Sequence, residues 1–293
     1  VGAPGSLFEA TVNHYAACVS DKSGGSVEVQ TFGSSQLGKD KELLQKLKLG
    51  QVDFALPSSV MSSVDDVFGI FEMPYIIQDR DHMRRVQGAM MDKFQSAAQE
   101  NGYYIVGLAE NGFRHITNNV RPINTPEDLK GVKLRTPNGA WRVKMFQEYG
   151  ANPTPMAFSD VFTALQTGVI DGQENPLSVI VSVKLDEVQK YLTLSGHVYS
   201  PAMLLVSKPF WEGLNDEQKA AFEKAATEAV AAMRGYVDNV ETSGVETLKE
   251  RGMQVNALTA EEKAEFQASI QSAYEGYYKT YGEELVKSIV ASE

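Results

Sequence analysis

The sequence is poor in the residues that disulfides and zinc sites require. Cys18 is the single cysteine among 293 residues, so no disulfide forms within the chain and a zinc site with two or more cysteines is excluded. The four histidines are scattered, which argues against a histidine-rich metal site. They are His14, His82, His115 and His197. We therefore expect neither a bound metal nor a cofactor.

Positive charge is also scarce. The chain has 27 Lys and Arg against 38 Asp and Glu, a formal net charge of −11. This acidic excess argues against nucleic-acid binding, which needs a basic face, and against docking on an anionic membrane surface. No apolar run approaches the roughly 18 residues of a transmembrane helix.

The common catalytic motifs are missing. No nucleophile elbow (G-x-S-x-G), P-loop, H-E-x-x-H or EF-hand loop occurs, and no G-x-G-x-x-G follows a predicted strand. A protein without enzymatic activity is therefore favoured. The alternative is an enzyme on an α/β scaffold, in which Asp171 or Glu174 acts as acid or base.

The hydrophobic pattern favours an α/β fold. The length favours two domains over one. Helical spacing at 7–20 and 39–49 alternates with strand-like segments at 26–32 and 52–56, a β-α-β rhythm typical of parallel strands. Further strands are predicted at 103–109, 132–136, 170–171, 191–194 and 203–207.

The last third of the chain is predicted to be helical. Asn215 and Gln218 have the spacing of a capping box, and apolar residues then recur every three or four positions as far as Arg251. A helix over about 215–251 is roughly 50 Å long, enough to brace two domains. A second capping box at Thr259 begins the last predicted helix.

Two arginines follow predicted strands. Arg135 ends the strand at 132–136, and Arg114 follows the strand at 103–109. Ligands of open α/β sheets lie outside the carboxyl ends of strands, and a guanidinium fork matches a carboxylate. The two arginines could thus converge on one anion. Each could equally be a surface arginine.

Three further side chains are candidates for a pocket. Asn175 is an amide within a Gly- and Pro-bounded segment flanked by apolar runs, where it bonds either to the protein or to a ligand. Phe158 ends a proline-stiffened extended stretch, and Trp141 follows the Asn138 turn. Both aromatic rings fit either a pocket wall or the core.

Three long motifs together resemble a known family. They are K-G-V-K-L-R-T-P-N at 130–138, G-A-N-P-T-P-M-A-F at 150–158 and A-L-Q-T-G-V-I-D-G-Q-E-N-P at 164–176. With S-S-Q-L-G at 34–38 and F-E-M-P-Y at 71–75, they resemble the DctP-type solute-binding proteins of tripartite ATP-independent periplasmic (TRAP) transporters. The resemblance covers nearly the whole chain.

The resemblance implies a two-lobed periplasmic-binding-protein-like α/β fold that closes on an organic acid. Lobe I would comprise 1–111 and 201–240, and lobe II 112–200 and 241–293, with hinge crossings near 111 and 200 and the long helix spanning both. It also implies a monomeric periplasmic protein that serves a membrane permease. The start at Val1, where the family has a first strand, is then expected to be a processed or trimmed end. The same architecture would suit the receptor of an ATP-driven importer or a sensor domain.

The resemblance also implies a ligand site. Arg135 matches the main carboxylate-binding arginine of the family, Arg114 a second one, and Phe158 an aromatic that packs on the ligand. Ser58 stands where sialic-acid binders have a glutamate, which argues against sialic acid. A sugar acid, a hydroxy or keto acid, or an aromatic acid fits. The expected ligand-binding residues are Arg135, Arg114, Asn175, Phe158, Asn138, Ser58 and Trp141.

Overall fold

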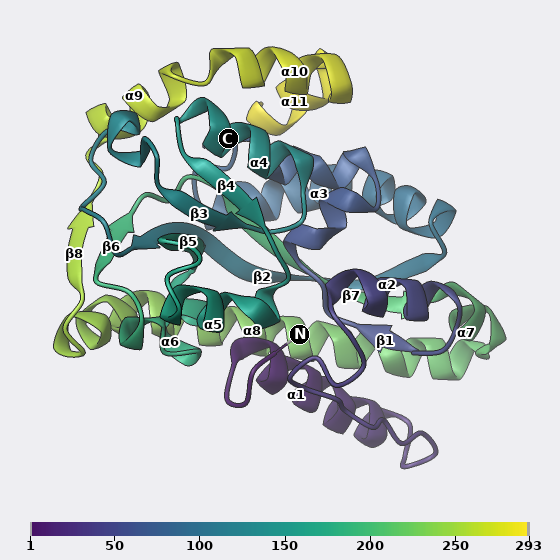
Figure 1. The fold of residues 1–293 in the computed structure, drawn as a ribbon. Coiled ribbons are helices and arrows are strands. Elements are labelled where there is room, and N and C mark those ends of the chain that lie inside the picture. Colours follow the sequence, from purple (N-terminus) through teal and green to yellow (C-terminus); the bar gives the residue numbers. More distant parts are fainter. Residues whose placement is uncertain (1, 292–293) are drawn as a thin grey trace.

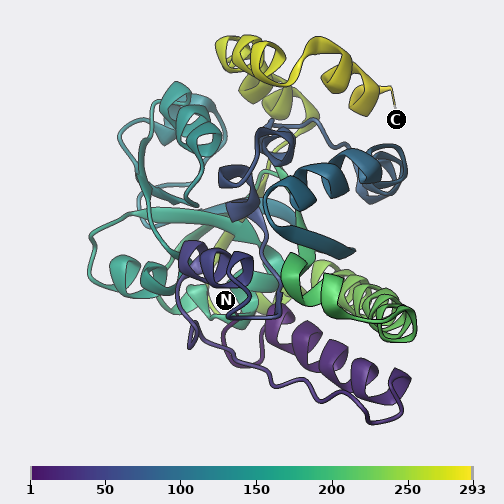
Figure 2. The ribbon, with the colours of Figure 1, turned by 90° about the vertical axis from the view of Figure 1, so that its right-hand side faces the viewer.

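A computed structural model describes residues 2–291, and its architecture is mixed α/β (Figure 1). One continuous sheet has the strand order β1-β7-β2-β5-β3-β4, with β6 pairing with β2 and β8. Helices cover it on both sides, as the rotated view in Figure 2 shows. The strands are β1 (Phe54–Ala55), β2 (Tyr103–Asn118), β3 (Lys133–Thr136), β4 (Asn152–Pro155), β5 (Gly172–Pro176), β6 (Tyr191–Leu194), β7 (Tyr199–Ser207) and β8 (Gln254–Ala257).

The sheet is mixed rather than parallel, which corrects the expectation from the β-α-β rhythm. β3 runs parallel to β4 and to β5, and β6 runs parallel to β8. β2 runs antiparallel to β7, β5 and β6, and β1 runs antiparallel to β7. The antiparallel partners of β2 come from much later in the chain, so local alternation of helix and strand could not reveal them.

Strand β2 joins the two halves of the sheet. Its first part, 103–113, pairs with β7, and its last part, 114–118, lies between β5 and β6. The register with β7 shifts between Glu110 and Gly112, where Gly112 adopts a positive φ of 112° that favours glycine. Arg114 is predicted from the sequence to follow a strand that ends at 109. It lies within β2, because the strand continues through this bulge.

The strand predicted at 26–32 is wrong. Residues 27–33 have no regular secondary structure. Val27 and Val29 are partly buried against the cluster formed with α1 and α8, while Phe32 is half exposed. The alternation therefore reflects a one-sided apolar contact, and within residues 2–291 no neighbouring strand pairs with this segment.

In the last third of the chain the long helix follows the prediction closely, whereas the single last helix predicted after Thr259 is divided into three helices. α8 spans 35 residues from Asp216, and the Asn215–Gln218 capping box that begins it is confirmed. α8 packs against α1, β2 and α6. The α-helices are α1 (Leu7–Lys22), α2 (Asp40–Lys48), α3 (Arg80–Glu100), α4 (Ala140–Glu148), α5 (Val161–Gln166), α6 (Leu177–Ser182), α7 (Lys208–Gly213), α8 (Asp216–Glu250), α9 (Ala260–Ala268), α10 (Gln271–Tyr281) and α11 (Glu283–Val290). Within residues 2–291 none of them combines the length and apolarity that a membrane crossing needs.

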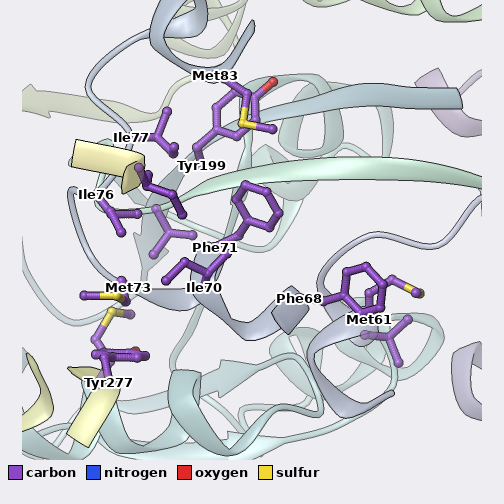
Figure 3. Close-up of a cluster of buried hydrophobic side chains, with 14 of the residues drawn as sticks. Met61, Phe68, Ile70, Phe71, Met73, Ile76, Ile77, Met83, Tyr199 and Tyr277 are labelled. Carbon is purple, nitrogen blue, oxygen red and sulfur yellow. The ribbon is translucent and has the colours of Figure 1, made fainter. Parts of the chain in front are cut away.

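The largest hydrophobic cluster lies between the sheet and the C-terminal helices. The segment from Met61 to Ile77, with the 3₁₀ helices η1 (Ser59–Ser63) and η2 (Asp66–Glu72), supplies much of it (Figure 3). Tyr277 of α10 packs into the same cluster. The C-terminal helices thereby pack against the segment that leads from β1 to α3.

Candidate ligand-binding site

A cavity opens where several elements meet at the sheet. It encloses about 770 Å³ of atom-free space, including solvent at its mouth. The start of α1, the segment after β1, β2, β3, η4 (Phe158–Asp160), β5 and α6 all contribute to its wall. Six of the seven predicted site residues line it: Arg135, Arg114, Asn175, Phe158, Asn138 and Ser58.

Arg135 presents a buried positive charge to this cavity. It lies in β3, is 3% exposed, and donates from Nε and Nη2 to the Met156 carbonyl at 3.1 and 2.8 Å. Its guanidinium carbon lies 5.7 Å from the ring centroid of Phe158. Burial lowers the pKa of Arg135 to about 10, so the group still carries its charge. Among the described residues, no carboxylate comes within ion-pair distance of it.

Arg114 is expected to be a second arginine free to bind the ligand carboxylate, but in the structure it is paired with a carboxylate of the protein. It is 2% exposed and lies in β2 opposite β5. Its Nε and Nη2 donate to the Glu174 carboxylate at 2.5 and 2.9 Å, and Nη2 also donates to the Asn175 Oδ1 at 3.1 Å. Glu174 therefore compensates much of the charge of Arg114, although Arg114 still lines the cavity.

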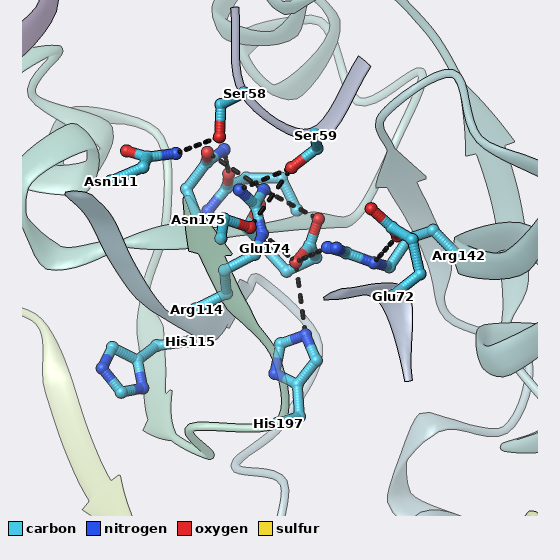
Figure 4. Close-up of polar contacts among 12 residues, drawn as sticks. Ser58, Ser59, Glu72, Asn111, Arg114, His115, Arg142, Glu174, Asn175 and His197 are labelled. Carbon is cyan, nitrogen blue, oxygen red and sulfur yellow. Dashed lines mark hydrogen bonds and ion pairs between the residues drawn. The ribbon is translucent and has the colours of Figure 1, made fainter. Parts of the chain in front are cut away.

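Glu174 is the centre of a buried polar cluster (Figure 4). Besides Arg114, it accepts from Arg142 Nη1 at 2.6 Å and from His197 Nε2 at 3.2 Å. Burial alone would raise the pKa of Glu174, but the two guanidinium groups outweigh it and hold the pKa below its usual range. Burial lowers the pKa of His197, which therefore donates as a neutral imidazole. The cluster holds Glu174 as a buried anion.

The neutral polar groups form a second part of the wall. Asn111 donates from Nδ2 to the Ser58 hydroxyl at 3.2 Å, and Ser58 donates to the Pro201 carbonyl at 2.7 Å. The buried Oδ1 of Asn111 has no hydrogen-bond partner within the described chain. Asn175 donates from Nδ2 to the Gln173 Oε1. These amides and hydroxyls suit a ligand with hydroxyl groups, because each can donate or accept.

The expectation that Trp141 lines the pocket is corrected. Its ring stacks on Tyr277 of α10, with centroids 4.2 Å apart, and lies near Tyr281 at 5.7 Å. Trp141 lies in the first turn of α4, which contacts α10, and it does not line the cavity. Apolar contact between α4 and α10 explains this placement.

Three wall or cluster residues escaped the sequence reasoning. Arg142 lies one residue after Trp141 in a mixed apolar and basic helix, which offered no sign of burial. Its partner Glu72, 70 positions earlier in the chain, is equally hidden in sequence. Asp40 lines the cavity from the start of α2, and its position after the S-S-Q-L-G motif was the available signal.

Comparison with known proteins places the chain in a family. Residues 1–280 match the family model for DctP, bacterial extracellular solute-binding protein family 7. The chain belongs to this family. A solute-binding protein of Verminephrobacter eiseniae is 36% identical over 285 residues, covering 96% of this chain and 84% of the relative. The C4-dicarboxylate-binding periplasmic protein of Rhodobacter capsulatus is 34% identical, covering 92% and 81%.

Solved structures agree with this assignment. A TRAP periplasmic solute-binding protein of Bordetella bronchispeptica, with density interpreted as pantoate, has a TM-score of 0.95 and 40% identity, covering 100% of this chain and 97% of that one. One from Polaromonas bound to D-erythronate has a TM-score of 0.95 and 35% identity, covering 99% and 96%. The chain is thus a solute receptor of the TRAP transporter type, and its relatives are binding proteins rather than enzymes.

Proposed function

We propose that the cavity binds a small hydroxy monocarboxylic acid through Arg135. The observation that carries this proposal is the buried Arg135 guanidinium, which has no carboxylate partner within residues 2–291. A buried charge without compensation is costly. A ligand carboxylate at Nη1 would compensate it, since the two bonds to the Met156 carbonyl use only Nε and Nη2.

Charge balance favours one carboxylate over two. Arg114 and Arg142 lie against Glu72 and Glu174, so these four groups carry as many positive as negative formal charges. Among the described residues, Arg135 is then the one cation of the cavity wall that has no carboxylate partner. Asp40 also lines the cavity and would repel a second carboxylate.

The rest of the wall suits hydroxyl groups and a short carbon chain. Ser58, Ser59 and Asn111 offer donors and acceptors, and the Asn111 Oδ1 has no partner within the described residues. Leu7, Val60 and other apolar side chains cover the remaining wall. Pantoate and D-erythronate, named for two similar structures, are both hydroxy monocarboxylates. Galactonate, named for a third, has the same chemistry.

Lobe closure is the second part of the proposal. Lobe I comprises 1–111 and 201–240, and lobe II 112–200 and 241–293. The β2 bulge between Glu110 and Gly112 lies opposite Pro201 and Ser200 of β7, so both crossings fall at one level of the sheet. Closure there excludes water and strengthens the contacts of a bound anion. The closed receptor then delivers its acid to the membrane permease from the periplasm.

Titration calorimetry with four acids tests the ligand class. The hydroxy monocarboxylates pantoate, D-erythronate and galactonate are compared with the dicarboxylate succinate, which is named for another similar structure. We expect at least one hydroxy monocarboxylate to bind at least about tenfold more tightly than succinate, roughly 1.4 kcal/mol. Tighter binding of succinate would contradict the charge argument.

A further inference from the structure

Arg142 lies behind the cavity wall and reaches the site through Glu174. It is 0% exposed in α4 and does not line the cavity. Its Nε donates to the Glu72 carboxylate at 2.7 Å, and its Nη1 donates to the Glu174 Oε2 at 2.6 Å. Figure 4 shows Arg142 between the two carboxylates, on the side of Glu174 away from Ser58.

The two carboxylate oxygens of Glu174 accept different numbers of hydrogen bonds. Oε2 accepts from Arg114 Nε, Arg142 Nη1 and His197 Nε2. Oε1 accepts from Arg114 Nη2. A single carboxylate is therefore divided between two guanidinium groups, and it cannot fully compensate either of them. Arg142 offsets part of the negative charge of Glu174, and to that extent the positive charge of Arg114 remains uncompensated.

We infer that Arg142 is a positioning residue for ligand binding, whose positive charge behind Glu174 offsets part of the negative charge that Glu174 presents to its bidentate partner Arg114, so that Arg114 stays partly positive toward an anion in the cavity. The inference rests on the proposed function, because it requires an anionic ligand beside Arg114 and Arg135. It assigns a role to a residue that touches no ligand and lies outside the cavity wall.

Glu72 sets how strongly Arg142 acts on Glu174. Its carboxylate accepts from Arg142 Nε, and its backbone carbonyl accepts from the Tyr277 hydroxyl at 2.9 Å. Glu72 competes with Glu174 for the charge of Arg142. Removing the charge of Glu72 while keeping its shape gives Glu174 a stronger partner in Arg142, and Arg114 is released further toward the ligand.

Two variants separate this role from a merely structural one, because they are expected to shift affinity in opposite directions. Glu72→Gln keeps an acceptor for Arg142 Nε, and we expect the Kd for the bound acid to fall about threefold. The double variant Glu72→Gln/Arg142→Gln leaves the net charge of the cluster unchanged and gives Glu174 to Arg114 alone. We expect its Kd to rise about fivefold.

The matched control is the charge-neutral pair Glu283→Gln/Lys287→Gln, which removes an ion pair of 2.8 Å in α11, a helix that does not line the cavity. We expect its Kd to equal that of the wild type. Calorimetry uses pantoate, D-erythronate and galactonate as probes, with the wild type measured first. If the wild type binds none of them, the proposed function fails and the inference falls with it.

Suppose that the wild type binds an acid of the panel. If both variants then bind it more weakly, or if both have a Kd within about twofold of the wild-type Kd, the positioning role of Arg142 is wrong while the proposed function stands. Should the double variant not fold, Glu72→Gln alone decides. Tighter binding supports the inference, and unchanged or weaker binding overturns it.

Discussion

The Arg135 guanidinium lies over the ring of Phe158, with its carbon 5.7 Å from the ring centroid. Both residues line the cavity, so the ring holds the cation in place and shields one of its faces from water. Replacing Phe158 by leucine keeps the apolar volume but removes the attraction of the ring for the cation. We predict that Phe158→Leu raises the Kd of the bound acid about fivefold, measured by calorimetry.

Phe162→Leu is the matched control for this prediction. Phe162 lies in the neighbouring helix α5 and packs partly buried against the same hydrophobic cluster, but it does not line the cavity. The same chemical change there should leave the Kd unaltered. Equal effects of the two substitutions would show that the Phe158 effect comes from packing alone.

Lys39 and Asp160 form an ion pair beside the cavity, with Nζ 2.7 Å from Oδ2. Asp40, next to Lys39, and Phe158, two positions before Asp160, both line the cavity wall. The pair joins segments 121 positions apart, so it links two sides of the site. We predict that Lys39→Gln raises the Kd about threefold at low salt and leaves it unchanged in roughly 0.5 M NaCl. Exposed ion pairs are weak, and salt screens the attraction between their charges.

The charge-swapped variant Lys39→Asp/Asp160→Lys controls for loss of either side chain alone. It restores an ion pair of reversed order, and calorimetry at low salt should return the Kd to near the wild-type value. A swap that binds as weakly as Lys39→Gln would contradict a role of the pair in holding the site.

Trp141 serves the fold rather than the ligand. Its stack on Tyr277 joins α4 to α10 with ring centroids 4.2 Å apart. We predict that Trp141→Leu lowers the free energy of unfolding by about 2 kcal/mol, measured by urea denaturation, and leaves the Kd within about twofold of the wild type. A large loss of affinity without loss of stability would place Trp141 in the binding site after all.

His115 makes stability depend on pH. Burial lowers its pKa from 6.5 to about 3, with His197, Lys263 and Arg114 acting in the same direction. Between these values the unfolded chain binds a proton that the folded chain does not, so stability falls as pH decreases below about 6.5. His115→Gln can still accept from the Gly196 amide, as His115 Nδ1 does at 3.2 Å.

We therefore predict that the free energy of unfolding of His115→Gln decreases less than that of the wild type as the pH falls from roughly 6.5 to roughly 4. Urea denaturation at several pH values measures it. His14→Gln, at an exposed position of α1, serves as the control and should keep the wild-type slope. An unchanged slope in His115→Gln would show that other groups cause the acid sensitivity.

Local signals predicted the helix ends well. The capping boxes at Asn215 and Thr259 each depend on residues three positions apart, and both form as the sequence indicates. Strand pairing depends on distant residues, which explains the errors at 26–32 and in β2. An alternating apolar pattern cannot show whether a neighbouring strand is present to receive its hydrogen bonds.

The site was predictable only in part for the same reason. The family motifs placed Arg135, Phe158 and Asn175 in the cavity wall. They did not show that Glu174, 60 positions after Arg114, would take up most of that arginine's hydrogen bonds. The charge balance among buried groups can be worked out only when the distances between them are known. Here it shows that Arg114 is paired with Glu174 and is not a free arginine at the cavity wall.

The central claim is that Arg135 is the free cation that binds the ligand carboxylate. Calorimetry on Arg135→Ala, with the tightest-binding acid of the panel, tests it most directly. Arg121→Ala, at an exposed arginine outside the cavity wall, is the matched control. We predict a rise in Kd of at least about 100-fold, roughly 2.7 kcal/mol, for Arg135→Ala and none for the control. A Kd within about threefold of the wild type would contradict the account.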